Sequence, residues 1–157
     1  MIIKRIFLST LYILLLLYLL IFIPVIWGYK PLVIISGSME PTLKVGGILY
    51  YTEIDKSNYK TNDIVVFKAS KYLISHRIIE IQNDGFITKG DANKNIDSNK
   101  VLFSKALGKG TNWSIPYIGY YADFIYKNKW ILLIVLLILI VDSLLSNYVE
   151  EDNENNK

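Results

Sequence analysis

The stretch YLISHRIIEIQNDGFITKGD, residues 72–91, carries the strongest structural signal in the chain. Its first half is rich in β-branched and aromatic residues, as strands typically are. Alternation with a period of two places Ile74, His76 and Ile78 on one face of that strand. An Asp-Gly dipeptide, which is a strong two-residue turn signal, and a second strand-like run, GFITK, follow. The stretch therefore predicts a β-hairpin.

The hairpin has a consequence for His76, which is the only histidine of the chain. If residues 84–85 form the loop, the pairing places His76 opposite Asn93 and Ile78 opposite Asp91. The segment KGDANKNID, which continues from the second strand, also contains Asp97. Local geometry alone therefore predicts a carboxylate beside the imidazole, and it slightly favours Asp91 by proximity.

Further strand-like runs surround the hairpin, namely GILYYT (47–52) and DIVVFK (63–68), with glycine, asparagine and aspartate between them. Residues 29–127 are therefore predicted to form a compact, mostly β domain. The chain has no cysteine, which excludes disulfides, thiolate zinc sites and a cysteine nucleophile. A net charge of +3 is too small to indicate nucleic-acid binding, and a single histidine without any cysteine argues against a metal site.

Two apolar segments explain why 52% of the residues are hydrophobic. Residues 6–27 contain no charge, and a helix of that length rises about 33 Å, enough to cross a hydrocarbon core of about 30 Å. A cleaved signal peptide is the alternative, but the run is longer than a usual signal core and WGYKPLV lacks the small residues of a cleavage site. Residues 1–28 are therefore predicted to be an uncleaved transmembrane anchor.

A shorter apolar run, WILLIVLLILIV at 130–141, is flanked by lysines and a tryptophan that suit a membrane interface. It predicts a second transmembrane helix at 128–147, followed by an acidic, disordered tail at 148–157. Lys4 and Arg5 place the N-terminus in the cytoplasm. Two spans then place the β domain on the extracytoplasmic face of the plasma membrane and the C-terminus in the cytoplasm.

The segment ISGSMEPT, residues 35–42, supplies a candidate nucleophile for the histidine. A serine hydroxyl attacks efficiently only when a neighbouring base takes its proton, and a carboxylate that orients that base completes a catalytic triad. Gly37 permits an unusual backbone angle and the close approach of a substrate. The same residues also fit an ordinary turn, and the spacing alone does not bring Ser38 to His76.

Three motifs in order, SGSMEP after an N-terminal span, HRI on a strand and KGDAN with a further aspartate, resemble type I signal peptidases. The resemblance covers residues 1 to about 122. Within this family, the chain resembles most the subgroup found in the endoplasmic reticulum, in archaea and in some spore-forming bacteria, because His76 stands where the other bacterial enzymes carry lysine. It implies a signal-peptidase-like β domain and a membrane-bound serine endopeptidase that removes signal peptides from exported preproteins.

The resemblance also implies roles for individual residues. Ser38 is the expected nucleophile and His76 the general base, with Asp97 orienting the imidazole and Asp91 supporting the site; which acid matters more stays open at this point. The backbone N–H of Ser38 and the hydroxyl of Ser36 are expected to form the oxyanion hole.

The partners expected from the resemblance are the signal peptides of preproteins and the lipid bilayer, with small side chains one and three residues before the cut. No cofactor or metal is required, and accessory subunits stay open. Other membrane serine hydrolases fit less well because Ser38 lacks a Gly-x-Ser-x-Gly elbow. A self-cleaving Ser-Lys peptidase would not need two spans, and a non-enzymatic subunit would not need the complete Ser38, His76, Asp91 and Asp97 set.

Overall fold

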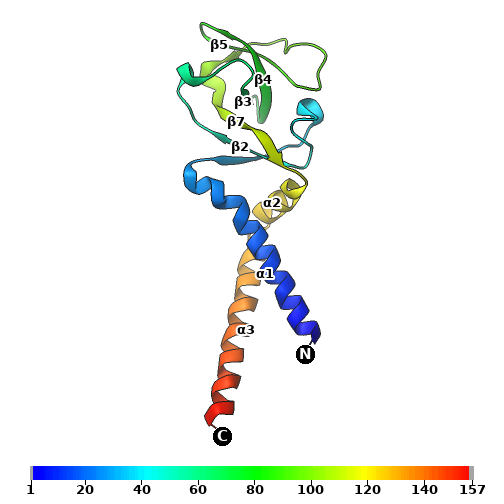
Figure 1. The fold of residues 1–157 in the computed structure, drawn as a ribbon, viewed down its shortest axis with the longest axis vertical. Helices are drawn as coiled ribbons and strands as arrows, with labels where there is room; N and C mark the ends of the chain where they lie inside the picture. Colours follow the sequence, from blue (N-terminus) through cyan, green and yellow to red (C-terminus); the bar gives the residue numbers. More distant parts are fainter. Residues whose placement is uncertain (1, 156–157) are drawn as a thin grey trace. The chain divides into compact units, whose positions relative to one another are not determined.

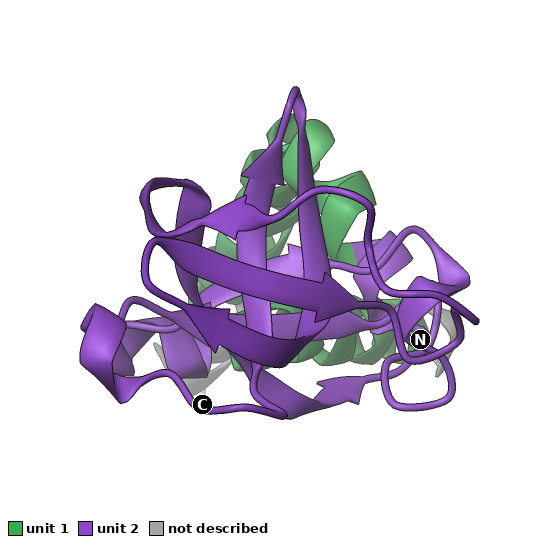
Figure 2. Cartoon of the chain, turned by 90° about the horizontal axis from the view of Figure 1, so that it is seen from above, with its two compact units in different colours: residues 1–20, 122–157 green, residues 21–121 purple. Residues whose placement is uncertain are grey.

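The computed structural model describes residues 2–155, which divide into two compact units (Figure 2). One unit consists of residues 1–20 and 122–157, and the other of residues 21–121. The second unit contains the whole β-sheet. The sequence placed this domain at 29–127, so the compact unit begins earlier and ends earlier than that prediction.

The sheet has seven strands in the order β1-β2-β7-β3-β4-β5-β6, and all its pairings are antiparallel (Figure 1). The strands are β1 (Lys30–Val33), β2 (Ile48–Thr52), β3 (Ile64–Ala69), β4 (Tyr72–Gln82), β5 (Gly85–Lys89), β6 (Val101–Leu102) and β7 (Ala106–Ile115). Short 3-10 turns lie between them: η2 (Gly37–Met39), η3 (Lys56–Asn58) and η4 (Phe103–Lys105). The β domain predicted from the strand pattern is thus present, and its sheet is antiparallel.

The two faces of the sheet bury two separate apolar clusters, and strand β3 contributes to both. Ile64 and Val66 point into one cluster, whereas Val65 and Phe67 point into the other, as the two-residue period of a strand requires. The first cluster also holds Met39, directly after the candidate nucleophile. A strand buried on both faces gives the site a rigid base, because packed interiors resist displacement.

The predicted hairpin is present, but its predicted register is wrong. Gln82 pairs with Gly85 and Ile78 with Thr88, so residues 83–84 form the turn, and a bulge lies between Ile78 and Glu80. Gly85 is needed inside the strand, because a Cβ there would collide with the backbone of β6 at Val101 and Leu102. The glycine therefore reflects a close approach of β6, and the turn shifts by one residue.

The first predicted span corresponds to α1 (Ile2–Phe22) and the 3-10 turn η1 (Ile23–Trp27). Residues 4–27 have the length and hydropathy of a membrane-crossing helix. The structure also contains α2 (Ile118–Lys127), which the strand pattern did not predict, and α3 (Trp130–Asn155). α2 and residues 130–146 reach the length and hydropathy of a span only together, and they are bent by 89°. The second span therefore stays a prediction.

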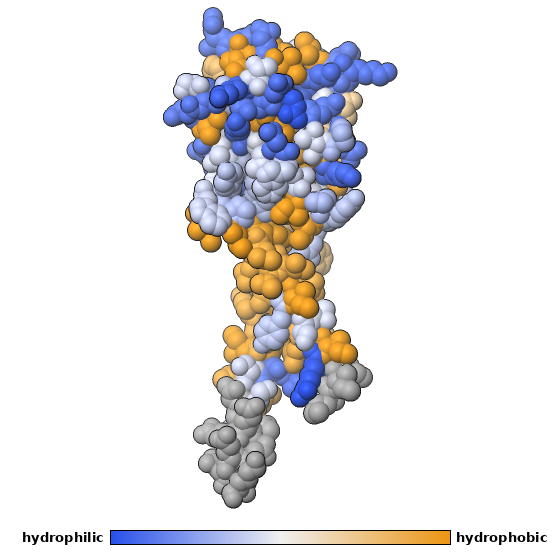
Figure 3. Space-filling model, in the orientation of Figure 1, coloured by the Kyte–Doolittle hydropathy of each residue, from blue (hydrophilic) through white to orange (hydrophobic). Residues whose placement is uncertain are grey.

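Helix α3 continues through residues 148–155, where the sequence predicted a separate disordered tail, and residues 156–157 lie outside the described part of the chain. In Figure 3 the visible surface of α1 and α3 is predominantly apolar. Lys4 Nζ lies 2.5 Å from Asp142 Oδ1, which joins the start of α1 to the polar end of the apolar run in α3. Over the described residues, helical positions outnumber strand positions. "Mostly β" therefore describes the 21–121 unit and not the chain.

Candidate active site

His76 lies in the middle of β4 and contacts both a serine and an aspartate. Its Nε2 is 3.2 Å from Ser38 Oγ, and its Nδ1 is 2.5 Å from Asp97 Oδ2. The residue is only 8% exposed, and it pairs with Val65 of the doubly buried strand β3. The imidazole thus sits between a hydroxyl on one side and a carboxylate on the other, and the buried strands hold it in place.

Ser38 belongs to the short turn η2, which is held by the burial of the next residue and by hydrogen bonds to its backbone carbonyls. The next residue, Met39, is buried in the first apolar cluster, and its carbonyl accepts a hydrogen bond from the N–H of Leu43. The Ser38 carbonyl accepts a hydrogen bond of 2.9 Å from the N–H of Ala92. A Cβ on Gly90 would lie 2.5 Å from that carbonyl oxygen, so only glycine permits this approach.

Asp97 is held by a residue that the sequence analysis missed. Thr88 Oγ1 donates a hydrogen bond of 2.6 Å to Asp97 Oδ2, and the N–H of Asp97 donates to the carbonyl of Thr88. Thr88 is completely buried in β5, on the same face as Phe86. Strand alternation marks residue 88 as buried, and a buried hydroxyl needs a hydrogen-bond partner. This signal in the sequence could have identified Thr88 as part of the site.

Asp91 binds a different set of partners. Arg77 donates to both of its carboxylate oxygens, from Nε at 2.7 Å and from Nη2 at 2.6 Å, and Thr42 Oγ1 donates to it at 2.7 Å. Arg77 Nη1 also donates to the carbonyl of Asn62. The proximity argument that favoured Asp91 beside His76 is wrong, because the register shift and the bulge move the start of the loop toward Arg77.

The ion pair changes the electrostatics of both partners. The hydrogen bonds from Arg77 hold the pKa of the Asp91 carboxyl below its usual value, against the opposing effect of burial. The same contact raises the pKa of Arg77. Asp91 is therefore a charged structural partner that ties the loop after β5 to β4 and to Thr42, close to the turn that carries Ser38.

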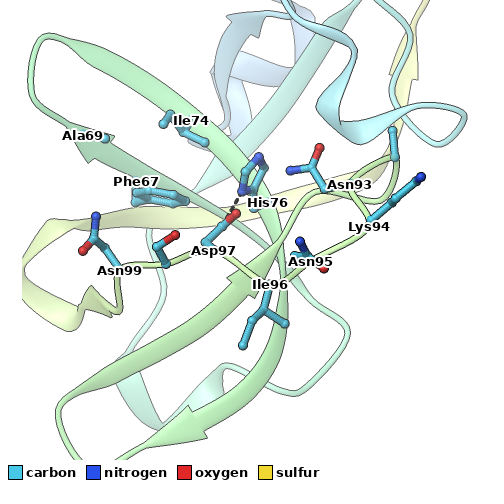
Figure 4. Close-up of a pocket in the computed structure, with 12 residues that line it drawn as sticks. Phe67, Ala69, Ile74, His76, Asn93, Lys94, Asn95, Ile96, Asp97 and Asn99 are labelled. Carbon is cyan, nitrogen blue, oxygen red and sulfur yellow. Dashed lines mark hydrogen bonds and ion pairs between the residues drawn. The ribbon is translucent and has the colours of Figure 1, made fainter.

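Two cavities flank His76. The smaller one, of about 140 Å³, is lined by residues 32–36, by Ser38 and Met39, and by residues 73–76. Ser36 is exposed and lines this cavity beside Ser38. The larger cavity, of about 680 Å³, is lined by Phe67, Ala69, Ile74 and His76 and by the loop 92–99 (Figure 4). Within the described part of the chain, no group of three or more His, Asp or Glu side chains could hold a metal ion.

Comparisons with known proteins identify the family. The model described as "Signal peptidase, peptidase S26" matches residues 4–100. The chain is 31% identical over 99 residues to "Signal peptidase I W" of Bacillus subtilis (strain 168), covering 59% of this chain and 52% of the relative. It is 32% identical over 106 residues to the human "Signal peptidase complex catalytic subunit SEC11C", covering 55% and 52%.

A third relative, "Signal peptidase complex catalytic subunit SEC11" of Zygosaccharomyces rouxii, is 30% identical over 136 residues, covering 76% of this chain and 80% of the relative. The chain spans about half the length of the first two relatives. The region that the family model matches contains Ser38, His76, Asp91 and Asp97. The chain therefore belongs to the signal peptidase family, peptidase S26.

Proposed function

We propose that this chain is a membrane-anchored serine endopeptidase that removes signal peptides from exported preproteins. The observation that carries the proposal is the continuous contact from Ser38 Oγ through His76 to Asp97, at 3.2 Å and 2.5 Å. The serine attacks the scissile carbonyl, and His76 Nε2 takes its proton. Asp97 accepts the Nδ1–H hydrogen bond, which fixes the tautomer that leaves Nε2 free to act as a base.

The negative charge that develops on the carbonyl oxygen needs donors beside the nucleophile. The backbone N–H of Ser38 and the hydroxyl of Ser36 are proposed for this role, which is supported by the position of Ser36 in the same cavity. His76 then gives its proton to the leaving amine, and water hydrolyses the acyl-enzyme through the same base. Asp91 supports the site indirectly, through Arg77, Thr42 and the loop whose Ala92 N–H bonds the Ser38 carbonyl.

The smaller cavity suits an extended peptide with small side chains. Strand β1 lies at one end of the sheet, and β5 pairs with residues 77–82 of β4. Within the described chain, this leaves the outer edge of β1 and the start of β4 available on the two sides of the cavity. An extended substrate can add to such edges through backbone hydrogen bonds. The volume of this cavity, about 140 Å³, is far below that of a drug-sized pocket. The cavity therefore admits alanine-sized side chains and excludes large ones.

A cleavage assay tests this function directly. The full-length protein, in lipid vesicles, should cut a model preprotein once, after a signal peptide with alanine one and three residues before the cut. Replacing both alanines by tryptophan should abolish cleavage, because the cavity cannot hold the larger rings. Intact alanine substrate after prolonged incubation, or equal cleavage of the tryptophan substrate, would contradict the proposal.

The proposed topology keeps both termini in the cytoplasm and the β domain, from residue 29 to about 127, outside. It is supported by the ion pair between Lys4 and Asp142, because paired charges lie at the same side of a membrane. A tag after Lys157 should therefore resist protease added to the extracytoplasmic side of intact cells. A protease site inserted at Ser70, in the β3–β4 turn, should be cut in the same sample. Digestion of the tag from outside would rule out the two-span arrangement.

A further inference from the structure

The larger cavity shares His76 with the smaller one but does not contain the nucleophile. The two cavities share Ile74 and His76, so the histidine stands between them. Ser38 lines the smaller cavity and is absent from the lining of the larger one. A peptide that crosses the serine and the histidine must therefore extend from one cavity toward the other.

The chemistry decides which end of the peptide lies on which side. The carbonyl carbon first bonds to Ser38 Oγ, and when the C–N bond then breaks, the proton on His76 Nε2 moves to the departing amine. The acyl part stays covalently attached to the serine, so it belongs in the cavity that contains Ser38. The departing amine belongs beyond His76, where the larger cavity begins.

The lining of the larger cavity changes character from one side of His76 to the other. Figure 4 shows the apolar side chains of Phe67, Ala69 and Ile74 on one side and those of Asn93 and Lys94 on the other. The remaining lining residues of the loop 92–99 are mostly small or polar: Ala92, Asn95, Ile96, Ser98 and Asn99. Such side chains can bind the backbone of an extended peptide without selecting large residues.

The exposed charge in the lining of this cavity is positive. Two of the lining side chains are ionisable apart from the histidine, namely Asp97 and Lys94. The Asp97 carboxylate is occupied by His76 and Thr88. Lys94 is exposed at the opposite side of the histidine from the apolar wall (Figure 4). An approaching side chain therefore meets a cation.

We propose that the larger cavity binds the first residues of the mature protein, immediately after the scissile bond, and that Lys94 favours an acidic residue among them. This inference rests on the proposed function and adds a specificity-determining residue to it. The substrate class is thus a preprotein with a small residue before the cut and an acidic residue shortly after it. Lys94 acts through charge and takes no part in proton transfer.

The test uses model preproteins that differ only in the second residue after the cut, which is glutamate, glutamine or lysine. With the wild-type protein in vesicles at low salt, kcat/KM for the glutamate substrate should exceed that for the lysine substrate by about ten-fold, since each exposed ion pair or like-charge contact contributes about three-fold. Raising the salt concentration to about 1 M should remove most of this ratio, because the charges are then screened. Lys94→Glu should invert the ratio.

Lys105→Glu is the matched control, because it makes the same charge change at an exposed lysine outside the cavity lining. It should keep the wild-type preference. Two results would overturn the inference, provided that the glutamine substrate is still cut. One is equal kcat/KM for the glutamate and lysine substrates in the wild-type protein, and the other is an unchanged ratio of these values in Lys94→Glu. Failure to cut the glutamine substrate would instead contradict the proposed function.

Discussion

Ser38→Ala should lower kcat for preprotein cleavage by at least about 10⁴-fold, because it removes the only hydroxyl within hydrogen-bond reach of His76 Nε2 among the described contacts. The change deletes one oxygen atom from a turn that is held by the buried Met39 and by the Ala92 N–H. Expression, membrane insertion and thermal unfolding should therefore match the wild-type protein. The measurement is single-turnover cleavage of the model preprotein, with thermal unfolding of the same preparation.

Ser36→Ala is the matched control, since it removes the same hydroxyl from the other serine of the same segment. Its expected loss in kcat is about 10²- to 10³-fold, which is the usual effect of removing one oxyanion donor. The two variants thus distinguish a nucleophile from a residue that stabilises the oxyanion. Wild-type processing by Ser38→Ala, or a larger loss from Ser36→Ala, would refute the assignment of the nucleophile.

Local patterns in the sequence were sufficient to predict the elements that carry the site. The strand signal in residues 72–81 predicted that His76 shares one face with Ile74 and Ile78, and the histidine lies in β4 at 8% exposure. The uncharged run at residues 6–27 predicted an apolar helix, and residues 4–27 have the length and hydropathy of one. Both features depend on neighbours along the chain, so a period of two or a run of apolar residues is enough to find them.

The choice between the two acids depended on contacts that are distant in sequence. Gly85 was expected in the turn, but the backbone of β6 occupies the space where its Cβ would be. That contact shifts the register, and the bulge after Ile78 shifts it again. A single sequence does not encode contacts between distant strands as a pattern. The helix at 118–127 was missed for a different reason, because its tyrosines and its glycine at short spacing fit either a strand or a helix.

The two carboxylates near His76 have different partners, and these partners predict different consequences of the same substitution. Asp97 shares one oxygen between His76 and Thr88 in a largely buried setting, so its charge faces the imidazole. Asp91 is neutralised by two hydrogen bonds from Arg77. A neutral amide at residue 97 changes the tautomer of the histidine, whereas a neutral amide at residue 91 leaves the Arg77 guanidinium without its charged partner.

Asp97→Asn should lower kcat by about 10⁴-fold while the fold is retained, as in other triads in which the acid becomes an amide. His76 Nδ1 and Thr88 Oγ1 both contact Oδ2, so an amide NH₂ group at that position donates to Nδ1 and to the Thr88 hydroxyl oxygen. An N–H donor at that place requires Nδ1 to be the acceptor and therefore puts the proton on Nε2. The histidine then cannot take the proton of Ser38. Cleavage kinetics at saturating preprotein measure this loss.

Asp91→Asn makes the matched change in the other acid, and its effect should be on stability more than on chemistry. We expect a loss in kcat of no more than about 10²-fold, from a small displacement of the Ser38 turn, together with a lower unfolding midpoint at pH 7. Arg77 holds the pKa of Asp91 below its usual value, so the charge of Asp91 stabilises the fold above about pH 4, and this stabilisation is lost as the pH falls through the lowered pKa. The difference in unfolding midpoint between the wild-type protein and Asp91→Asn should therefore shrink at pH 3. A greater loss of kcat in Asp91→Asn than in Asp97→Asn would transfer the orienting role to Asp91, and equal tolerance of both variants would exclude the triad.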